Sequence, residues 1–136
     1  MLATFPLFKG VSKRRLRKLT ANATLAEFAP GETIILAGDP DDRLYIILSG
    51  RAQTTPRGDQ QVFGIGDYFG VLAVIDRRPR SATVVATSHA HVMKLPSRPV
   101  LELARRHPAI TFTLLAGLTA RLRQVESRET RAAAAG

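Results

Sequence analysis

Short apolar runs, separated by glycine and proline, fill the middle of the chain and predict β-strands joined by tight turns. The runs are Thr33–Leu36, Leu44–Leu48, Gln61–Ile65, Ala82–Ala86 and His91–Leu95. Turn-forming residues lie between them. The segment Thr55–Gln60, which contains Pro and Gly-Asp, has the composition of a hairpin tip. Many short strands at this spacing are typical of an antiparallel sandwich or roll.

Helical periodicity replaces this pattern on either side. Ser12 is a residue type that caps helix N-termini. An apolar stripe runs between the basic residues around it, formed by Val11, Leu16, Leu19 and Ala23. After the strands, Arg98–Arg106 predicts a short helix. Pro108 should end this helix, because proline lacks the backbone N–H that a helix interior requires.

A last helix is expected from Ala109. Its larger apolar residues recur at spacings of three, four and three, at Leu115, Leu118, Leu122 and Val125. This short a/d seam is suited to packing on the strands or to pairing with a second copy in a homodimer. The segment Arg131–Gly136 offers no packing residues, and we expect it to fray.

We therefore predict one α+β domain over residues 1–136 rather than a parallel α/β fold. The expected order is a helical segment at 10–24, a β-roll at 25–96, C-terminal helices at 97–131 and a tail at 132–136. A chain of 136 residues is long enough to bury one substantial core. No internal repeat or linker divides it.

Composition narrows the range of partners. Lys and Arg number 20 against 11 Asp and Glu, a formal net charge of +9. The basic residues are spread along the chain, which favours solvated helix faces, so we expect no sequence-specific nucleic-acid binding from this chain alone. The absence of cysteine excludes disulfides and thiolate metal sites. No signal peptide or membrane-length apolar run is present, and this favours a cytoplasmic protein without membrane insertion.

The segment Gly66–Val84 carries the most specific chemistry. Gly66 and Gly70 allow a tight backbone path. Residues 71–75 can form one short helical turn, whose first amide N–H groups favour an anion. Arg80 can then hold a phosphate through two parallel hydrogen bonds, while small residues beside it leave room for the ligand to approach the backbone. This cassette suits a single compact phosphate.

The order and spacing of several motifs resemble the cyclic nucleotide-binding domain family, of which the cAMP receptor-like sensor domains are members. The matching segments are Leu7-Phe8, Phe28-Ala-Pro-Gly-Glu32, Gly38-Asp39, Leu44–Gly50, Gly66-Asp-Tyr-Phe-Gly70 and Pro79–Val84. The resemblance implies an eight-stranded antiparallel β-roll of jelly-roll type, flanked by an N-terminal helix and C-terminal helices. It also implies that the last helix serves as a dimer contact and ligand lid.

The resemblance further implies a set of ligand contacts. Arg80 would bind the exocyclic oxygens of the cyclic phosphate, and Gly70 would lie close to the ribose. Further phosphate contacts would come from the Ser81 hydroxyl and from backbone N–H groups around Leu72, Ala73 and Ala82.

One position departs from the family pattern. Val71 occupies the place where the family carries a glutamate that accepts a hydrogen bond from the ribose 2′-OH. A hydrogen bond to a charged group is worth about 1.5–3 kcal/mol, hence roughly ten- to a hundredfold in affinity. We therefore expect weakened rather than abolished nucleotide binding.

Other candidate residues have structural interpretations. Arg80 could be a surface residue at a turn and Ser81 a turn cap, while Tyr45 and Phe69 are expected to be core aromatics. His89 and His91 should share one face of a strand, but no third ligand is evident, so no metal site is expected.

No catalytic constellation is present, and neither an enzyme nor a cofactor is expected. The favoured hypothesis is a regulatory domain that senses a cyclic nucleotide and relays binding through the C-terminal helix to a fused or associated effector. The resemblance also implies cAMP rather than cGMP as the ligand, because cGMP-selective members of the family often carry threonine at the position of Ser81. The alternative is a degenerate domain without a ligand, which serves dimerisation or protein interaction.

Overall fold

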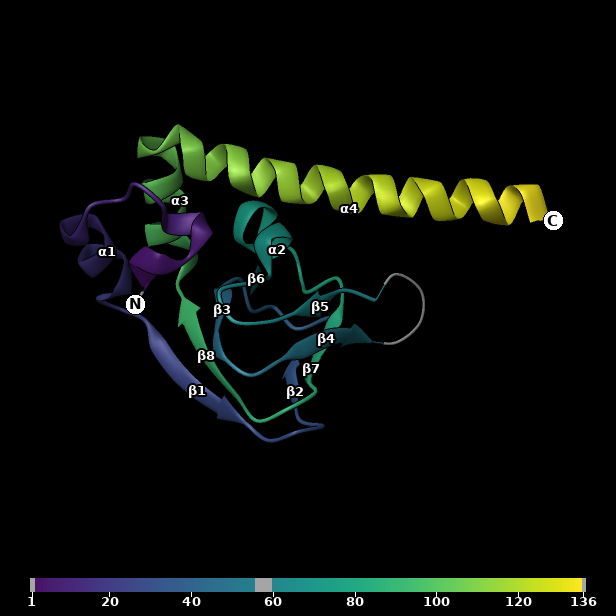
Figure 1. The fold of residues 1–136 in the computed structure, drawn as a ribbon, viewed down its shortest axis with the longest axis horizontal. Coiled ribbons are helices and arrows are strands. Elements are labelled where there is room, and N and C mark those ends of the chain that lie inside the picture. Colours follow the sequence, from purple (N-terminus) through teal and green to yellow (C-terminus); the bar gives the residue numbers. More distant parts are fainter. Residues whose placement is uncertain (1, 56–59, 136) are drawn as a thin grey trace.

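Two four-stranded antiparallel sheets form the body of the protein, and helices cover one side of it (Figure 1). The computed structural model describes residues 2–55 and 60–135. In the first sheet the strand order is β1-β8-β3-β6, with bounds Thr24–Phe28, Ala90–Leu95, Leu44–Ser49 and Tyr68–Phe69. In the second the order is β2-β7-β4-β5, with bounds Thr33–Ile35, Thr83–Ala86, Ala52–Thr55 and Val62–Phe63. The expected eight-stranded antiparallel roll is confirmed.

The helices also follow the expected order. Two short 3-10 turns at Leu2–Thr4 and Pro6–Phe8 precede α1, which spans Lys13–Thr20. The Ser12 hydroxyl oxygen accepts a hydrogen bond from the backbone N–H of Arg15 at 3.2 Å, so Ser12 caps α1 as predicted. The cassette contains α2 at Val71–Asp76, and α3 and α4 span Ser97–Arg106 and Pro108–Ala135.

His107 and Pro108 separate the last two helices. His107 is extended, with φ −128° and ψ 92°, because a following proline disfavours the helical conformation. Pro108 then occupies the first position of α4, where the missing N–H has no cost. Pro108 therefore begins the next helix as well as limiting α3.

Three strands were not predicted from the apolar runs: β1, β4 and β6. β1 is largely exposed, β4 has the polar sequence Ala-Gln-Thr-Thr, and β6 is only two residues long. Ile65 lies in a turn rather than in the strand expected at Gln61–Ile65, and its side chain is exposed. Residues 56–59 of the expected hairpin tip lie outside the described residues.

Two clusters of buried side chains hold the fold together. One lies between the sheets and includes Tyr45, Ile47 and Phe69, so the two aromatics are core residues as expected. The other lies between the helices and the first sheet, and joins the N-terminal segment to α1, α2, α3 and α4. Removing this much apolar surface from water is the main stabilising contribution to the fold.

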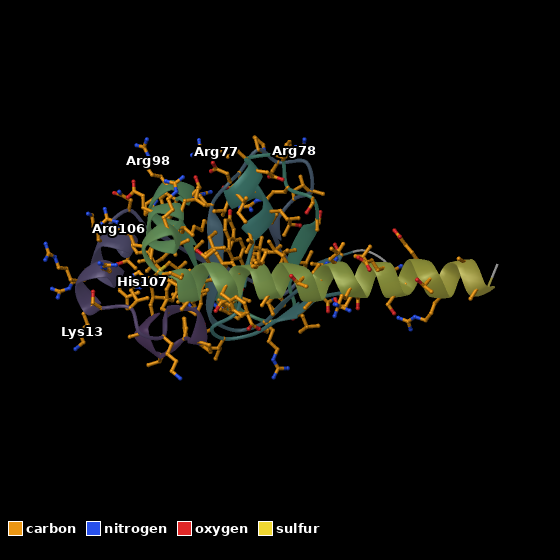
Figure 2. All side chains as sticks on the ribbon, turned by 90° about the horizontal axis from the view of Figure 1, so that it is seen from above. Lys13, Arg77, Arg78, Arg98, Arg106 and His107 are labelled. Atoms are coloured by element: carbon orange, nitrogen blue, oxygen red, sulfur yellow. The ribbon has the colours of Figure 1, made fainter. Side chains whose placement is uncertain are left out.

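Among the described side chains of the long helix α4, the fully buried ones lie in its first two turns. Ile110 and Leu114 are buried, whereas Leu115 and Leu122 are each 57% exposed. The four residues of the predicted seam are not buried equally: Leu118 and Val125 are half-buried, while Leu115 and Leu122 face solvent. The helix continues to Ala135, beyond the expected end of the C-terminal helices at residue 131, and fraying of this segment stays a prediction. Both views show α4 extending past the body of the protein (Figure 2).

Basic side chains surround the body instead of forming one patch. Figure 2 shows Lys13, Arg98 and Arg106 around the end formed by α1 and α3, and Arg77 and Arg78 near α2. All five side chains are exposed. This distribution favours the interpretation as solvated faces. Within the described part of the chain, no helix has both the length and the apolar character that crossing a bilayer would require.

Candidate functional site

A cavity of about 410 Å³ lies between α2, the second sheet and α4. Its volume falls within the range of small-molecule sites. The seven residues predicted as ligand contacts all line it: Gly70, Val71, Leu72, Ala73, Arg80, Ser81 and Ala82. The structure thus brings residues 70–73 and residues 80–82 of the cassette to the same cavity.

Gly70 starts the helical turn on the cavity wall. Its φ of 93° and ψ of 14° lie in the left-handed region, where glycine carries no steric penalty. The backbone N–H of Val74 donates to the Gly70 carbonyl at 3.3 Å, which begins α2. The amides of the first helical turn have no partner within the helix itself and carry partial positive charge.

Arg80 lies beneath this turn and is only 5% exposed, so its interpretation as a surface residue is wrong. Its Nη1 donates to the Gly70 carbonyl at 3.2 Å, and its Nη2 donates to the Arg43 carbonyl at 2.5 Å. The guanidinium also lies 5.2 Å from the centre of the Tyr45 ring. Its Nε is buried and has no hydrogen-bond partner among the residues that the structure describes. A buried donor without a partner costs free energy unless a ligand or water supplies an acceptor.

Asp41 places a negative charge close to Arg80, and no pattern in the sequence pointed to this residue. Asp41 Oδ1 lies 3.6 Å from Arg80 Nη2. The same carboxylate accepts hydrogen bonds from Arg43 Nε at 3.0 Å and from the Tyr45 hydroxyl at 2.5 Å. Partial burial alone would raise the pKa of Asp41, but these hydrogen bonds outweigh it and hold that pKa well below its usual range. The carboxylate therefore stays charged beside Arg80.

The neighbouring titratable groups respond to the same surroundings. Burial, with the hydrogen bond to Asp41, raises the pKa of Tyr45 to about 12, so its hydroxyl remains a donor at neutral pH. Burial, with repulsion from Arg43, lowers the pKa of Lys94, whose ammonium lies 5.2 Å from the Tyr45 ring centre. Asp41 thus lies within a group of cations and one aromatic ring. No motif in the sequence paired Asp41 with Arg80.

The remaining cavity walls are mostly apolar. Val71 is half-buried and packs against the helix cluster, while the backbone of Ala82 and the exposed Ser81 follow Arg80. From α4, the cavity receives Leu114, Gly117, Leu118 and Arg121. A helix late in the chain thus closes a cavity whose floor is formed by the cassette.

His89 and His91 lie away from this cavity, on the solvent face of the first sheet. Glu27 of β1 stands beside both, and the three side chains offer ligand atoms within 4.8 Å of one another. The expectation that no third potential ligand accompanies the two histidines is therefore wrong. Glu27 is far from the two histidines in the sequence, and the pairing of β1 with β8 brings it beside His91.

Several known proteins resemble this chain in sequence. A family model described as a cyclic nucleotide-binding domain matches residues 25–107. The CRP-like cAMP-activated global transcriptional regulator of Mycobacterium tuberculosis is 29% identical over 133 residues, which cover 93% of this chain and 59% of that protein. The cAMP-dependent protein kinase regulatory subunit of Hypocrea atroviridis is 35% identical over 96 residues, or 69% of this chain and 21% of that protein.

A comparison of the fold with solved structures finds a related regulator. The crystal structure of the Thermus thermophilus catabolite activator protein superposes with a TM-score of 0.72 at 27% identity, and the match covers 90% of this chain and 61% of that one. In each of these three comparisons this chain accounts for less than two thirds of the other protein's length. The family match covers more than half of the sequence and includes the whole cassette. The chain belongs to the cyclic nucleotide-binding domain family.

Proposed function

We propose that this domain is a regulatory sensor that binds a cyclic nucleotide, with cAMP as the preferred ligand. The observation that carries the proposal is Arg80, a buried cation on the wall of the cavity whose Nε lacks a hydrogen-bond partner in the described part of the chain. A guanidinium with a free donor beside the first amides of α2 suits a singly charged cyclic phosphate. The relatives named for cAMP support the choice of nucleotide.

In the proposed complex, Arg80 contacts the exocyclic phosphate oxygens. Backbone N–H groups of Leu72, Ala73 and Ala82, together with the Ser81 hydroxyl, would complete the anion site. The carbonyls of Gly70 and Arg43 already orient the guanidinium, so little side-chain entropy remains to be lost on binding. Asp41 offsets part of the cost of burying the guanidinium charge before the ligand arrives.

The ribose is expected to be held less well than the phosphate. Val71 lines the cavity but offers no acceptor for a 2′-OH group. We propose that cAMP binding is roughly ten- to a hundredfold weaker than it would be with a carboxylate at this position. The domain then responds to high rather than low nucleotide concentrations.

Binding at α2 has a physical route to α4. Val74 of α2 lies in one buried cluster with Leu103 of α3 and with Ile110 and Leu114 of α4. Leu118 of α4 also lines the cavity, so a ligand there can contact both ends of this route. A ligand that favours one position of α4 shifts the population toward that state, and a fused or associated effector would read the change.

Isothermal titration calorimetry of the purified domain with cAMP, cGMP and noncyclic AMP tests the proposal. We expect saturable binding of cAMP at submillimolar concentrations, weaker binding of cGMP and the weakest binding of AMP. Circular dichroism on the same samples monitors folding. Absence of saturable cyclic nucleotide binding by a folded domain would overturn the proposal.

A second function is favoured by the exposed side of α4. The seam of Leu115, Leu118, Leu122 and Val125 includes two leucines that are each 57% exposed, as a surface for a homodimer or another partner requires. A domain that has lost its ligand could retain this role. Sedimentation of the wild type against Leu118→Glu and Leu122→Glu distinguishes the cases, because an unchanged mass in both variants removes the seam from consideration.

A further inference from the structure

Glu27, His89 and His91 form a cluster on the outer face of the first sheet. Glu27 of β1 and His91 of β8 are direct cross-strand partners, and His91 pairs on its other side with Ser49 of β3. His89 lies two residues before His91, and the two ring centres are 5.1 Å apart. Strand pairing thus places two imidazoles and one carboxylate on the same surface.

The spacing of their ligand atoms is close to that of a bound metal ion. Glu27 Oε1 lies 2.5 Å from His89 Nε2 and 3.8 Å from His91 Nε2. In a tetrahedral site with bonds near 2.0–2.1 Å, neighbouring ligand atoms are about 3.3 Å apart. All three side chains are half or more exposed, so small rotations about their side-chain bonds can bring the atoms to that spacing.

A further contact orients one of the rings. Ser49 Oγ lies 2.8 Å from His91 Nδ1, which leaves Nε2 of His91 directed toward Glu27. Histidines that bind metal ions almost always have their second ring nitrogen held by such a hydrogen bond. Ser49 is therefore a positioning residue for His91, one of the three potential ligands.

We propose that Glu27, His89 and His91 form a surface site for a divalent transition-metal ion of the Zn²⁺ class. Two imidazole nitrogens and one carboxylate oxygen are a common donor set for zinc, and a fourth position would be taken by water. Mg²⁺ and Ca²⁺ prefer sites built of oxygen ligands and should not compete. The cluster shares no residue with the cavity beneath α4, so metal binding and nucleotide binding are separate properties.

The chain suits a direct test because it contains no cysteine and only three histidines. Untagged protein is titrated with Zn²⁺ in a non-chelating buffer, and calorimetry measures the heat of binding. We expect one saturable site, unaffected by excess Mg²⁺ or Ca²⁺. Co²⁺ substituted into the same protein should give the visible absorption of a coordinated ion.

Variants then assign the ligands. Glu27→Gln and His91→Ala should each lower Zn²⁺ affinity by tenfold or more, and Ser49→Ala by roughly tenfold, since loss of an orienting residue typically costs ten- to a hundredfold. His107→Ala is the matched control, because His107 lies between α3 and α4 and outside the cluster; its affinity should match the wild type. Equal affinity in the wild type, Glu27→Gln and His91→Ala would overturn the proposal, as would the absence of saturable binding by the wild type.

Discussion

Gly70 and Arg80 occupy their positions only because Gly70 has no side chain. A Cβ atom on Gly70 would overlap Nη1 of Arg80, and it would also lie 3.1 Å from the Arg43 carbonyl oxygen. Gly70 also has a φ of 93°, which other residues rarely adopt. The direction of the buried guanidinium therefore depends on a glycine at the start of α2.

Gly70→Ala should accordingly damage both stability and ligand binding. The left-handed conformation alone costs a residue with a Cβ about 1–2 kcal/mol, and the overlap displaces Arg80 as well. Urea unfolding followed by circular dichroism measures the first effect and a cAMP titration the second. Gly64→Ala is the control, since within the described residues its Cβ would meet Asp67 Oδ2 alone, at 4.0 Å. An unfolding free energy that falls equally in both variants would contradict the argument.

Arg80→Lys should lower cAMP affinity by at least about tenfold while keeping the positive charge. Lysine cannot make the two parallel hydrogen bonds of a guanidinium, and each hydrogen bond to a charged group is worth about 1.5–3 kcal/mol. Calorimetric titration provides the measurement. Arg78→Lys makes the same change two residues away on an exposed side chain, and its affinity should equal that of the wild type. A wild-type affinity in Arg80→Lys would remove Arg80 from the phosphate site.

Val71→Glu should raise cAMP affinity by roughly tenfold or more, because it adds a charged acceptor for the ribose 2′-OH. The gain should disappear with 2′-deoxy-cAMP, which lacks that hydroxyl, whereas the wild type should bind the two nucleotides about equally. Ile75→Glu is the matched control on α2, since Ile75 is 53% exposed and does not line the cavity. A gain that persists with 2′-deoxy-cAMP would show that the new charge acts in another way.

Asp41→Asn should change how stability depends on pH. The pKa of Asp41 is depressed in the folded state, so its contribution to stability is present above the unfolded pKa of about 3.9 and is lost as the pH falls below it. The wild type should therefore exceed the variant in unfolding free energy at neutral pH, and the difference should shrink from about pH 4 downward.

Urea unfolding at several pH values measures this difference. Glu126→Gln, a carboxyl-to-amide change on an exposed position of α4, controls for the loss of one ionisable group. A difference between wild type and Asp41→Asn that stays constant from neutral to acid pH would contradict the role of the carboxylate.

Local patterns in the sequence were sufficient for most of the fold. Apolar runs and turn residues located β2, β3, β5, β7 and β8, and capping chemistry located the start of α1. The other strands were missed because their signals are not local. β4 is polar, and it becomes a strand through pairing with β7 and β5. β1 is held by pairing with β8, from the far end of the roll.

In the candidate site too, residues close together in the sequence could be predicted and residues joined by tertiary contacts could not. The family resemblance pointed to seven residues within one short stretch of the chain, and all seven line one cavity. Asp41 and Arg121 reach that region from a loop and from α4, through tertiary contacts that no short motif encodes. The pairing of Glu27 with His91 escaped for the same reason, since register between distant strands decides it.

The buried side chains of α4 lie near its start, so a small tilt there displaces the far end of the helix. Leu114 is the last of its described side chains that is fully buried, and the axis from there to Ala135 is about 30 Å long at the usual rise of 1.5 Å per residue. A tilt of about ten degrees at Leu114 therefore moves the backbone at Ala135 by about 5 Å. The same tilt displaces residues near Leu114 far less, because the displacement grows with distance along the helix axis.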